Sequence, residues 1–471
     1  MTCLTVIGAG PGGYTAAFAA ARAGIDVTLI ESQSLGGTCL NSGCIPTKTL
    51  KASADALETA LRLSEFGIST QGIPRIDPVA VLARKNTVCA TLRDGLEKTC
   101  TRLGVKLLYG KGTILSAQCV DVTCADGNTC RVTGDDILIA TGSRVLELPD
   151  LPFDHHTIIS SDDALNADQI PPRVLIVGGG VIGCEMAFIY RAFGADVTVV
   201  EGQNRLLPLP SVDADMSTLI QREMKKRRIR CECNRTLAHV QVQEGKARAV
   251  LAASPFLRDP SPAQQQEVPV EADVVLVTVG RVPNSHGLGL EAAGIATDAR
   301  GWISVNDYLE TSVPHIYAIG DILGPPKVML AHVAAMEGLC VVDALSGKGR
   351  RPMDYSAVPS GIFTSPEIGC VGLSEKQALE QGYTVRCASL QVRALGKAQA
   401  MGELPGVFKI ISDAATGKIL GAHLAGAHAT DLIAEATLAI TMGATVHDIT
   451  QTIHAHPTLA EGFYETALLV P

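Results

Sequence analysis

Short apolar runs alternate along the chain with glycine-rich turns and with longer helical stretches. The first run, residues 4–7, leads into Gly8-Ala9-Gly10-Pro11-Gly12-Gly13 and an alanine-rich stretch over 14–23, and a second apolar run covers 26–31. A strand, a glycine-rich turn, a helix and a second strand form the nucleotide-binding half of a doubly wound sheet. The pattern therefore predicts an α/β fold that begins almost at the first residue.

The same pattern returns in the middle of the chain. An apolar run over 173–177 precedes Gly178-Gly179-Gly180-Val181-Ile182-Gly183, a helical stretch to 193 and a second run over 196–201. In both units an acidic residue lies 18 positions after the third glycine, Glu31 after Gly13 and Glu201 after Gly183. One G-x-G-x-x-G is weak evidence, and glycine turns also arise by chance, but two matched units predict two Rossmann-like dinucleotide sites.

The acidic residues suggest which dinucleotide binds where. Glu31 and Glu201 each close a second strand, where a carboxylate hydrogen-bonds a ribose hydroxyl. Because Glu201 would repel the 2′-phosphate of NADP, the second site is expected to bind NAD. Arg205 lies nearby in the sequence, which leaves NADP as the alternative.

Three more apolar runs end at a glycine. Residues 137–143 end at Gly142-Ser143, residues 316–321 at Gly320-Asp321, and residues 274–279 at Gly280. Strands that end in this way place amides and a carboxylate at the carboxyl edge of a sheet, where cofactors bind. A turn aspartate without a ligand is the alternative for Asp321.

The last part of the chain, from about residue 351, has a different pattern. It predicts strands at 368–371, 407–411 and 419–424 and helices at 431–442 and 446–451, and it contains no nucleotide fingerprint. Residues 252–269 are polar and rich in proline and glutamine, so they are expected to form a mobile loop within the second domain.

Composition narrows the functional classes. The 471 residues carry a net charge of −9 and only one basic run, 225–230, so neither nucleic acid nor a membrane is an expected partner. No apolar run reaches the roughly 18 residues that span a bilayer, and no signal-peptide pattern opens the chain. Fourteen cysteines are scattered through this large chain, which indicates a reducing, cytoplasmic setting. Cys231 and Cys233 lack a second cluster, so no metal site is expected.

Two of the cysteines stand apart from the rest. Cys39 and Cys44 are five residues apart, about 7.5 Å along a regular helix, whereas a disulfide needs Cα atoms roughly 4.4–6.8 Å apart. A bridge between them requires a distorted turn, for which the neighbouring glycines give freedom. Pro46 suits the first turn of a following helix, so Cys44 would lie at a helix N-terminus with Lys48 on the same face. Both features favour a thiolate, and the pair is interpreted as a redox dithiol.

A possible acid–base pair lies near the end of the chain. His456 precedes Pro457 and is followed five residues later by Glu461, as a base and its orienting carboxylate would be. A packed or capped histidine is the alternative, and it fits His454 better than His456.

Together these motifs give the chain a resemblance to the flavin disulfide reductases, and within them to the dihydrolipoamide dehydrogenases, over essentially its whole length. The resemblance rests on the segment 36–48, the paired fingerprints, the runs at 140–143, 280–284 and 318–321, Leu330-Ala331-His332 and the segment 454–461. It implies an FAD-binding domain with the redox disulfide at 1–149, an NAD-binding domain at 150–281, a central segment completing the FAD domain at 282–350, and an α+β dimerisation domain at 351–471.

The resemblance also assigns roles. Cys39 would be the thiol that attacks the substrate disulfide and Cys44 the thiol that stacks on the flavin. Lys48 would lie near the flavin and pair with Glu185, and His456, oriented by Glu461, would act as acid–base from the other subunit of a homodimer. The implied FAD contacts are Gly8, Gly10, Gly13, Glu31, Thr38, Lys48, Gly112, Thr141, Gly142, Ser143, Gly320, Asp321 and Ala331. The implied NAD contacts are Gly178, Gly180, Gly183, Glu201 and Gly280.

The implied reaction is oxidation of dihydrolipoamide on a lipoylated acyltransferase or an H-protein-like carrier. Val181 stands where glutathione-reducing relatives carry a tyrosine, which argues against the first alternative, an NADPH-dependent glutathione-type reductase. The second alternative is a non-catalytic flavin-binding subunit. Val333 replaces a lysine common after the Ala-His pair, and residues 252–269 look longer than the usual connection, so the partner surface is not assigned.

Overall fold

The computed structural model describes residues 2–325 and 327–471. The chain divides into two compact units, each built from separate segments. The first contains residues up to 50, 79–146 and 280–355, and the second contains 51–78, 147–279 and 356–471.

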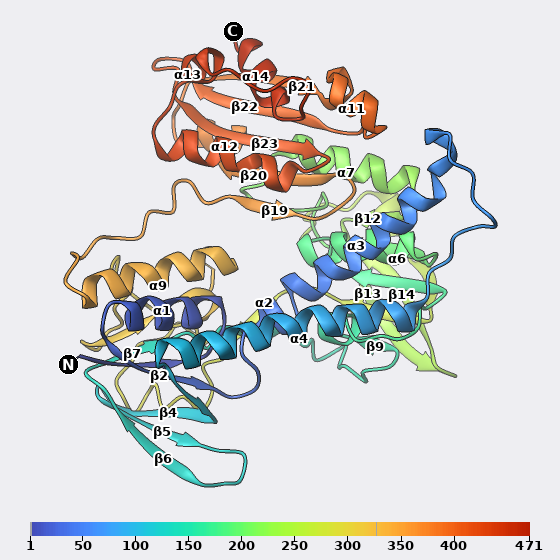
Figure 1. Ribbon diagram of the computed structural model, residues 1–471. Helices are drawn as coiled ribbons and strands as arrows, with labels where there is room; N and C mark the ends of the chain where they lie inside the picture. The colour runs from blue at the N-terminus through green and yellow to red at the C-terminus, as the bar shows by residue number, and fades with distance from the viewer. Residues whose placement is uncertain (1, 326) are drawn as a thin grey trace. The chain divides into compact units, whose positions relative to one another are not determined.

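The first unit is built on a five-stranded parallel sheet in the order β18-β7-β1-β2-β3. Its strands are β1 (Cys3–Ile7), β2 (Asp26–Glu31), β3 (Lys106–Tyr109), β7 (Asp136–Ile139) and β18 (Ile316–Ala318). Helix α1 (Pro11–Arg22) connects β1 to β2. It lies beside α9 (Ala331–Leu345), which belongs to the last sequence segment of the unit (Figure 1). Because β1 and β7 are buried along nearly their whole length, the loops at the carboxyl edge are held on a rigid base.

The unit also contains several other elements. They are α2 (Gly37–Asn41), the start of α3 (Cys44–Leu61), most of α4 (Pro78–Leu103), the antiparallel strands β4 (Lys111–Ser116), β5 (Cys119–Thr123) and β6 (Thr129–Thr133), the paired strands β8 (Ser143–Val145) and β17 (Arg281–Pro283), and the 3₁₀ turn η2 (Gly320–Leu323).

The second unit contains a second parallel sheet, in the order β12-β11-β10-β16-β9. Its strands are β9 (Ile158–Ile159), β10 (Arg173–Val177), β11 (Asp196–Glu201), β12 (Arg230–Cys233) and β16 (Val274–Val277). Helix α6 (Val181–Ala192) connects β10 to β11 as α1 connects β1 to β2. The short α5 (Ser161–Ala164), α7 (Ala214–Lys226), α8 (Pro262–Gln265) and the antiparallel strands β13 (Arg235–Gln243), β14 (Lys246–Ala253) and β15 (Val268–Ala272) complete this part.

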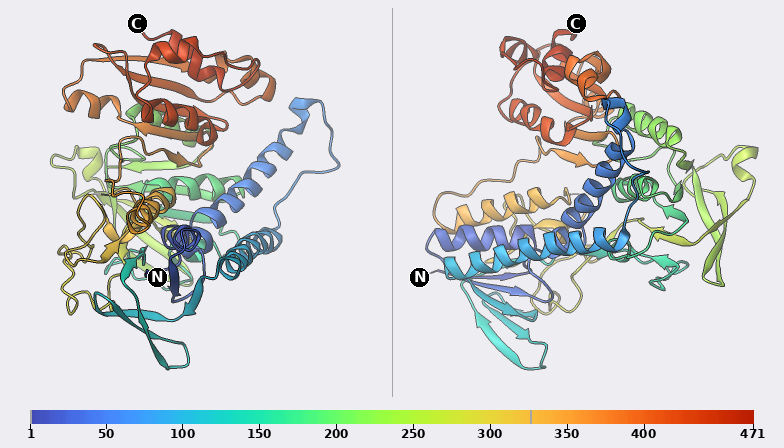
Figure 2. Two further views of the ribbon diagram at one scale, coloured as in Figure 1. Left: turned by 60° about the vertical axis from the view of Figure 1, so that its left-hand side comes forward. Right: turned by 45° about the vertical axis from the view of Figure 1, so that its right-hand side comes forward.

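The C-terminal part of the second unit is an antiparallel sheet with helices. The sheet, ordered β19-β20-β23-β22-β21, comprises β19 (Ser360–Ile362), β20 (Glu367–Gly372), β21 (Val385–Gln391), β22 (Val407–Asp413) and β23 (Ile419–Gly426). Its helices are α10 (Glu375–Glu380), α11 (Gly396–Met401), α12 (Ala429–Thr441), α13 (Val446–Gln451) and α14 (Glu461–Leu468), seen from two further sides in Figure 2. Phe408, Leu424, Ile433 and Phe463 share one hydrophobic core, so α12 and α14 pack on this sheet.

The α/β fold class, with two Rossmann-like sheets and a C-terminal α+β part, is confirmed. The prediction for 252–269 was wrong in part, because β14 extends to Ala253, α8 occupies four residues and β15 begins at Val268. Helix α8 has a capping box between Ser261 and Gln264, a local signal that the abundance of proline and glutamine obscured. Among the described residues no helix is long and apolar enough to cross a membrane. The predicted domain limits stay a prediction.

Candidate active site

Cys39 and Cys44 lie on either side of a break between two helices. Helix α2 ends at Asn41, and Cys44 is the first residue of α3. Between them Ser42 leaves helical geometry with φ −144° and ψ 26°. Gly43 is required because a Cβ there would lie 2.9 Å from the Thr38 carbonyl oxygen. The distorted turn expected from the spacing is therefore a change of helix.

The turn is held by Asn41, inside the motif, and by Arg93, which lies outside it. Asn41 Nδ2 donates to the carbonyls of Leu35 and Gly37, both at 2.9 Å. Arg93 of α4 donates to Asn41 Oδ1 at 2.8 Å. Only an asparagine in the middle of the cysteine motif hinted at this clamp.

The two thiols are unequal. The pKa of the Cys39 thiol is raised well above its usual value, first by the hydrogen bond with Cys44 and then by burial, while the charge of Lys48 opposes this change. Cys39 is half-buried and Cys44 is exposed. Cys39 is therefore the member that holds its proton tightly, and Cys44 has the helix N-terminus, a position that stabilises negative charge.

The first fingerprint has the geometry of a phosphate cradle. A Cβ on Gly8 would collide with the Ala140 carbonyl, and one on Gly13 would collide with that of Gly8. In contrast, a Cβ on Gly10 would meet nothing closer than 3.9 Å. Gly10 also precedes α1 without any side-chain cap, which leaves the helix N-terminus free to bind phosphate. Glu31 orders the loop by accepting from the amides of Ala9 (2.8 Å) and Gln33 (2.7 Å).

Residues from three separate strand ends meet beside this cradle. Ser143 Oγ donates to Asp321 Oδ2 at 2.7 Å, although 178 positions separate them in the sequence. Arg281 Nε donates to Ser143 Oγ at 2.7 Å, and Asn284 Nδ2 donates to the Thr141 carbonyl at 2.9 Å. The Thr141 hydroxyl is buried without a hydrogen-bond partner. A buried orphan hydroxyl at the carboxyl edge of the sheet fits a site that binds a polar cofactor such as FAD.

The other predicted FAD contacts lie in the same unit. Gly112 is in β4, Thr38 in α2, Gly142 follows β7 with φ +66°, and Ala331 is the first residue of α9. Gly320 donates its amide to Glu337 Oε2 at 2.6 Å, and Tyr355 donates to the other oxygen at 2.6 Å. Burial raises the pKa of Glu337. Sequence reasoning missed this carboxylate because nothing in the helical pattern of α9 marks it.

The second fingerprint repeats the first. A Cβ on Gly178 would lie 2.6 Å from the Thr278 carbonyl oxygen, one on Gly183 would collide with the Gly178 carbonyl, and one on Gly180 would meet nothing within 4 Å. Glu201 Oε2 accepts from the amide of Gly179 at 2.7 Å, and Oε1 from that of Gln203 at 2.6 Å. This cradle fits the diphosphate of NAD for the same reasons as the first.

Arg205, the residue that left NADP as the alternative cofactor, bonds to nearby backbone carbonyls. One of its nitrogens donates to the carbonyls of Leu209 (2.9 Å) and Val212 (3.0 Å). Through this nitrogen the guanidinium supports the loop before α7, while its other terminal nitrogen is buried without a hydrogen-bond partner among the described residues. The carboxylate of Glu201 stays beside the expected ribose site, which favours NAD over NADP.

For two predicted residues, Glu185 and Gly280, the expected partners belong to the other unit. Glu185 is buried in α6, where Oε1 accepts from the Phe363 amide at 2.9 Å. It belongs to the second unit and Lys48 to the first, so their ion pair stays a prediction. Gly280, assigned to NAD, falls in the first unit, where its carbonyl accepts from Leu146.

The C-terminal histidine forms the expected pair with its carboxylate. His456 Nδ1 lies 2.8 Å from Glu461 Oε1, and Glu461 Oε2 accepts from the Thr458 amide at 2.8 Å. The Thr458 amide, and next the hydrogen bond with His456, hold the pKa of Glu461 below its usual value. The His456 side chain is 79% exposed, whereas that of His454 is 7% exposed and bonded to Glu435 at 2.7 Å. Of the two histidines, His456 is thus the exposed one, and His454 is packed.

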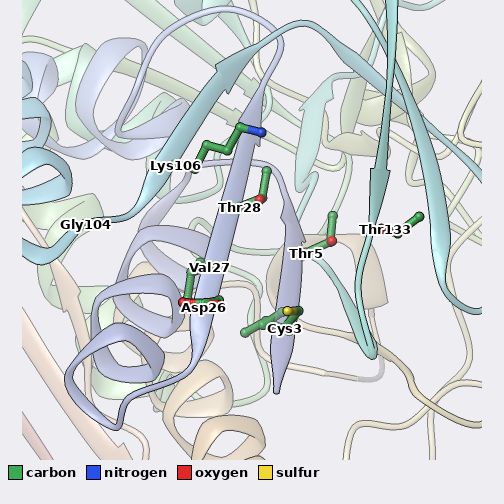
Figure 3. Close-up of a pocket in the computed structure, with 9 residues that line it drawn as sticks. Cys3, Thr5, Asp26, Val27, Thr28, Gly104, Lys106 and Thr133 are labelled. Carbon is green, nitrogen blue, oxygen red and sulfur yellow. The ribbon is translucent and has the colours of Figure 1, made fainter. Parts of the chain in front are cut away.

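A small depression of about 220 Å³ lies elsewhere in the first unit, around Cys3, Asp26, Lys106 and Thr133 (Figure 3). These residues lie at or near the amino ends of β1, β2 and β3, opposite the edge where nucleotides bind. It is not part of the candidate site.

Comparisons with known proteins agree with this geometry. Residues 3–338 match the family described as pyridine nucleotide-disulphide oxidoreductase, and residues 358–467 match its dimerisation domain. Dihydrolipoyl dehydrogenase of Chlamydia muridarum is 40% identical, with 98% of this chain and 96% of that protein covered, and that of Haloferax volcanii is 38% identical, with 99% and 95% covered. Among solved structures, LpdA of Mycobacterium tuberculosis has a TM-score of 0.90 at 28% identity, with 99% of both chains covered.

Proposed function

The chain belongs to the pyridine nucleotide-disulphide oxidoreductase family, and from this premise we propose that it is a dihydrolipoyl dehydrogenase. It oxidises dihydrolipoamide to lipoamide, and it uses FAD and NAD⁺. The observation that carries the proposal is the pair Cys39 and Cys44, which hydrogen-bond across the break between α2 and α3 in the unit that bears the first nucleotide cradle.

The chemistry of the protein's own residues is thiol–disulfide exchange. His456, oriented by Glu461, removes a proton from one substrate thiol, and the thiolate attacks the Cys39 sulfur of the oxidised pair. The Cys39–Cys44 bond breaks and leaves Cys44 as the thiolate, which the start of α3 and Lys48 stabilise. The second substrate thiol then attacks the substrate sulfur bonded to Cys39, Cys39 leaves and takes the proton held by His456, and His456 takes the proton of the second thiol, so lipoamide leaves and both cysteines are reduced.

When bound, FAD would supply the acceptor for the two electrons of the dithiol, and NAD⁺ would supply the final hydride acceptor. The residues proposed to hold FAD are the first fingerprint, Glu31, Thr141 and the Ser143–Asp321 pair. Those proposed to hold NAD are the second fingerprint and Glu201.

The first test is replacement of Cys44. Cys44→Ser should abolish lipoamide turnover while FAD stays bound, because the disulfide can no longer form but the cradle is intact. Cys130→Ser, which changes an exposed cysteine on β6, is the matched control and should keep full activity. Full lipoamide activity in Cys44→Ser would sink the assignment.

The second test concerns the base. His456→Gln should slow the half-reaction with dihydrolipoamide by about 100-fold or more, the range of general-base catalysis, and should leave flavin reduction by NADH unchanged. His454→Gln is the control, since that ring is packed. Equal effects of His456→Gln on both half-reactions would indicate a structural role.

Two rival functions are separated by simple measurements. An NADPH-dependent glutathione-type reductase predicts faster turnover with NADPH than with NADH, whereas Glu201 predicts the reverse. A non-catalytic flavin-binding subunit predicts no reduction of the Cys39–Cys44 disulfide by dihydrolipoamide, which thiol counting after anaerobic mixing measures.

The assembly and setting are also proposals. The match to a dimerisation domain supports a homodimer in which each subunit contributes His456 to its partner's dithiol. The substrate carrier is proposed to be a lipoylated acyltransferase or H-protein-like protein, in a cytoplasmic 2-oxoacid dehydrogenase or glycine cleavage system. The domain limits 1–149, 150–281, 282–350 and 351–471 are proposed with it.

A further inference from the structure

The segment 252–269, for which the sequence suggested no role, places an aromatic ring at the second nucleotide cradle. Phe256 lies against Gly202, the residue directly after Glu201, since a Cβ on Gly202 would lie 3.0 Å from two carbons of its ring. The residue nevertheless stays 70% exposed. One side of the ring therefore lies against the turn after β11, while most of Phe256 remains accessible.

The backbone around Phe256 is fixed by hydrogen bonds to the same turn. The Asn234 amide donates to the Gln203 carbonyl at 2.8 Å, and the Ser254 amide donates to the Asn234 carbonyl at 2.9 Å. Ser254 is buried, and its hydroxyl accepts from the Phe256 amide at 3.2 Å. The position of the ring is thus tied to the residues that follow Glu201.

A second anchor holds the far end of the segment. Arg235 is buried at the start of β13, and its guanidinium donates to the carbonyls of Ala263, Gln264 and Gln266 at 2.6–2.8 Å. Helix α8 is thereby fastened to the sheet that carries β14 and β15. Since both ends of the segment are fastened, Phe256 does not depend on a ligand for its position.

The location of the ring has a chemical meaning if the second cradle binds NAD, so the inference rests on the proposed function. In such folds the acid at the end of the second strand binds the adenosine ribose, and adenine is attached to that ribose. An aromatic ring that lies against Gly202, the residue next to Glu201, is placed where adenine can stack on it. A single exposed phenylalanine needs no explanation by itself, but one seated beside Glu201 does.

We propose that Phe256 is the stacking platform for the adenine of NAD and so a binding residue supplied by the 252–269 segment. Stacking of a base on an aromatic side chain strengthens binding, and alanine substitution removes that contribution. Because Phe256 is largely exposed, we expect its loss to change the dissociation constant by roughly 5- to 10-fold.

The test uses ligands that contain or lack adenine. Binding of ADP-ribose and of nicotinamide mononucleotide to the FAD-loaded enzyme is measured by calorimetry, because neither ligand reduces the flavin. Phe256→Ala should weaken ADP-ribose about 5- to 10-fold and leave the mononucleotide unchanged, and Phe256→Tyr should retain the affinity of the native chain. Phe66→Ala, at another exposed phenylalanine, is the control for loss of apolar surface.

Unchanged binding of ADP-ribose to Phe256→Ala would overturn the inference, and so would equal weakening of both ligands. Failure of the proposed function has a different signature. In that case the native chain itself would bind no ADP-ribose, whatever residue occupies position 256.

Discussion

The second glycine of the NAD cradle gives the sharpest test of how the fingerprint works. A Cβ on Gly180 would meet nothing within 4 Å, and the residue has φ −73° and ψ −167°, which alanine also adopts. Gly180→Ala should therefore cost the fold less than about 1 kcal/mol, the usual loss for alanine at an N-cap. Its methyl group, however, occupies the space through which a diphosphate reaches the start of α6.

The expected loss of affinity follows from the hydrogen bonds at stake. A charge-assisted hydrogen bond from an amide to phosphate contributes about 1.5–3 kcal/mol, so displacement of the diphosphate from one amide weakens NADH by about 10-fold or more. Gly183→Ala differs, because its Cβ would collide with the Gly178 carbonyl and push α6 from β10. That variant should also lose about 1–3 kcal/mol of stability, the cost of overpacking.

The assay combines two measurements on the same samples. The NADH concentration dependence of flavin reduction gives the apparent affinity, and thermal unfolding gives the stability. Gly396→Ala is the control, since a Cβ there also meets nothing within 4 Å and the site is remote from the fingerprint in sequence. Native-like NADH affinity in Gly180→Ala would refute the reasoning that this glycine exists to admit the diphosphate.

Two predictions concern stability. Lys409 is buried, and its ammonium contacts carboxylate oxygens of Asp213, Asp215 and Glu375 at 2.7–3.0 Å. Lys409→Met should lower the free energy of unfolding by about 3 kcal/mol, because it leaves the buried Asp213 without its cation. Lys376→Met, at an exposed site, should have little effect in the same urea titration. The pKa of Glu461 is lowered in the folded chain, so its contribution to stability is present above its unfolded pKa of about 4.3 and is lost as the pH falls through the folded value. Glu461→Gln should therefore reduce the acid-induced loss of stability in unfolding measured from neutral pH downward, and an unchanged acid profile would contradict this linkage.

The sequence predicted most of the fold because local patterns determine it. Residues 26–31, 173–177 and 196–201 were predicted as strands and are β2, β10 and β11 with the same limits. Each is an apolar run bounded by turn residues, and strands buried on both faces have that pattern. The capped α8 was missed because four residues are too few for a helical period.

In the candidate site too, residues within one motif could be predicted from the sequence, whereas contacts between distant residues could not. Residues in contiguous motifs, such as Cys39 and Cys44, were identified directly. The contacts between Ser143 and Arg281, and between Glu337 and Gly320, depend on the topology that brings distant strand ends and α9 together. Spacing in the sequence carries no information on such contacts. The role of Glu337 and the position of Phe256 against Gly202 could therefore be found only in the structure.

The Lys409 cluster has a consequence for how variants of this protein are interpreted. Lys409 on β22 forms ion pairs with Asp213 and Asp215 at the start of α7 and with Glu375 of α10. These pairs link the nucleotide-binding part of the second unit to the C-terminal sheet, on which α14 packs. A lesion at Asp213 touches neither a nucleotide nor a thiol. It would still disturb the support of His456, and an inherited or selected change there would resemble a change at the proposed base itself.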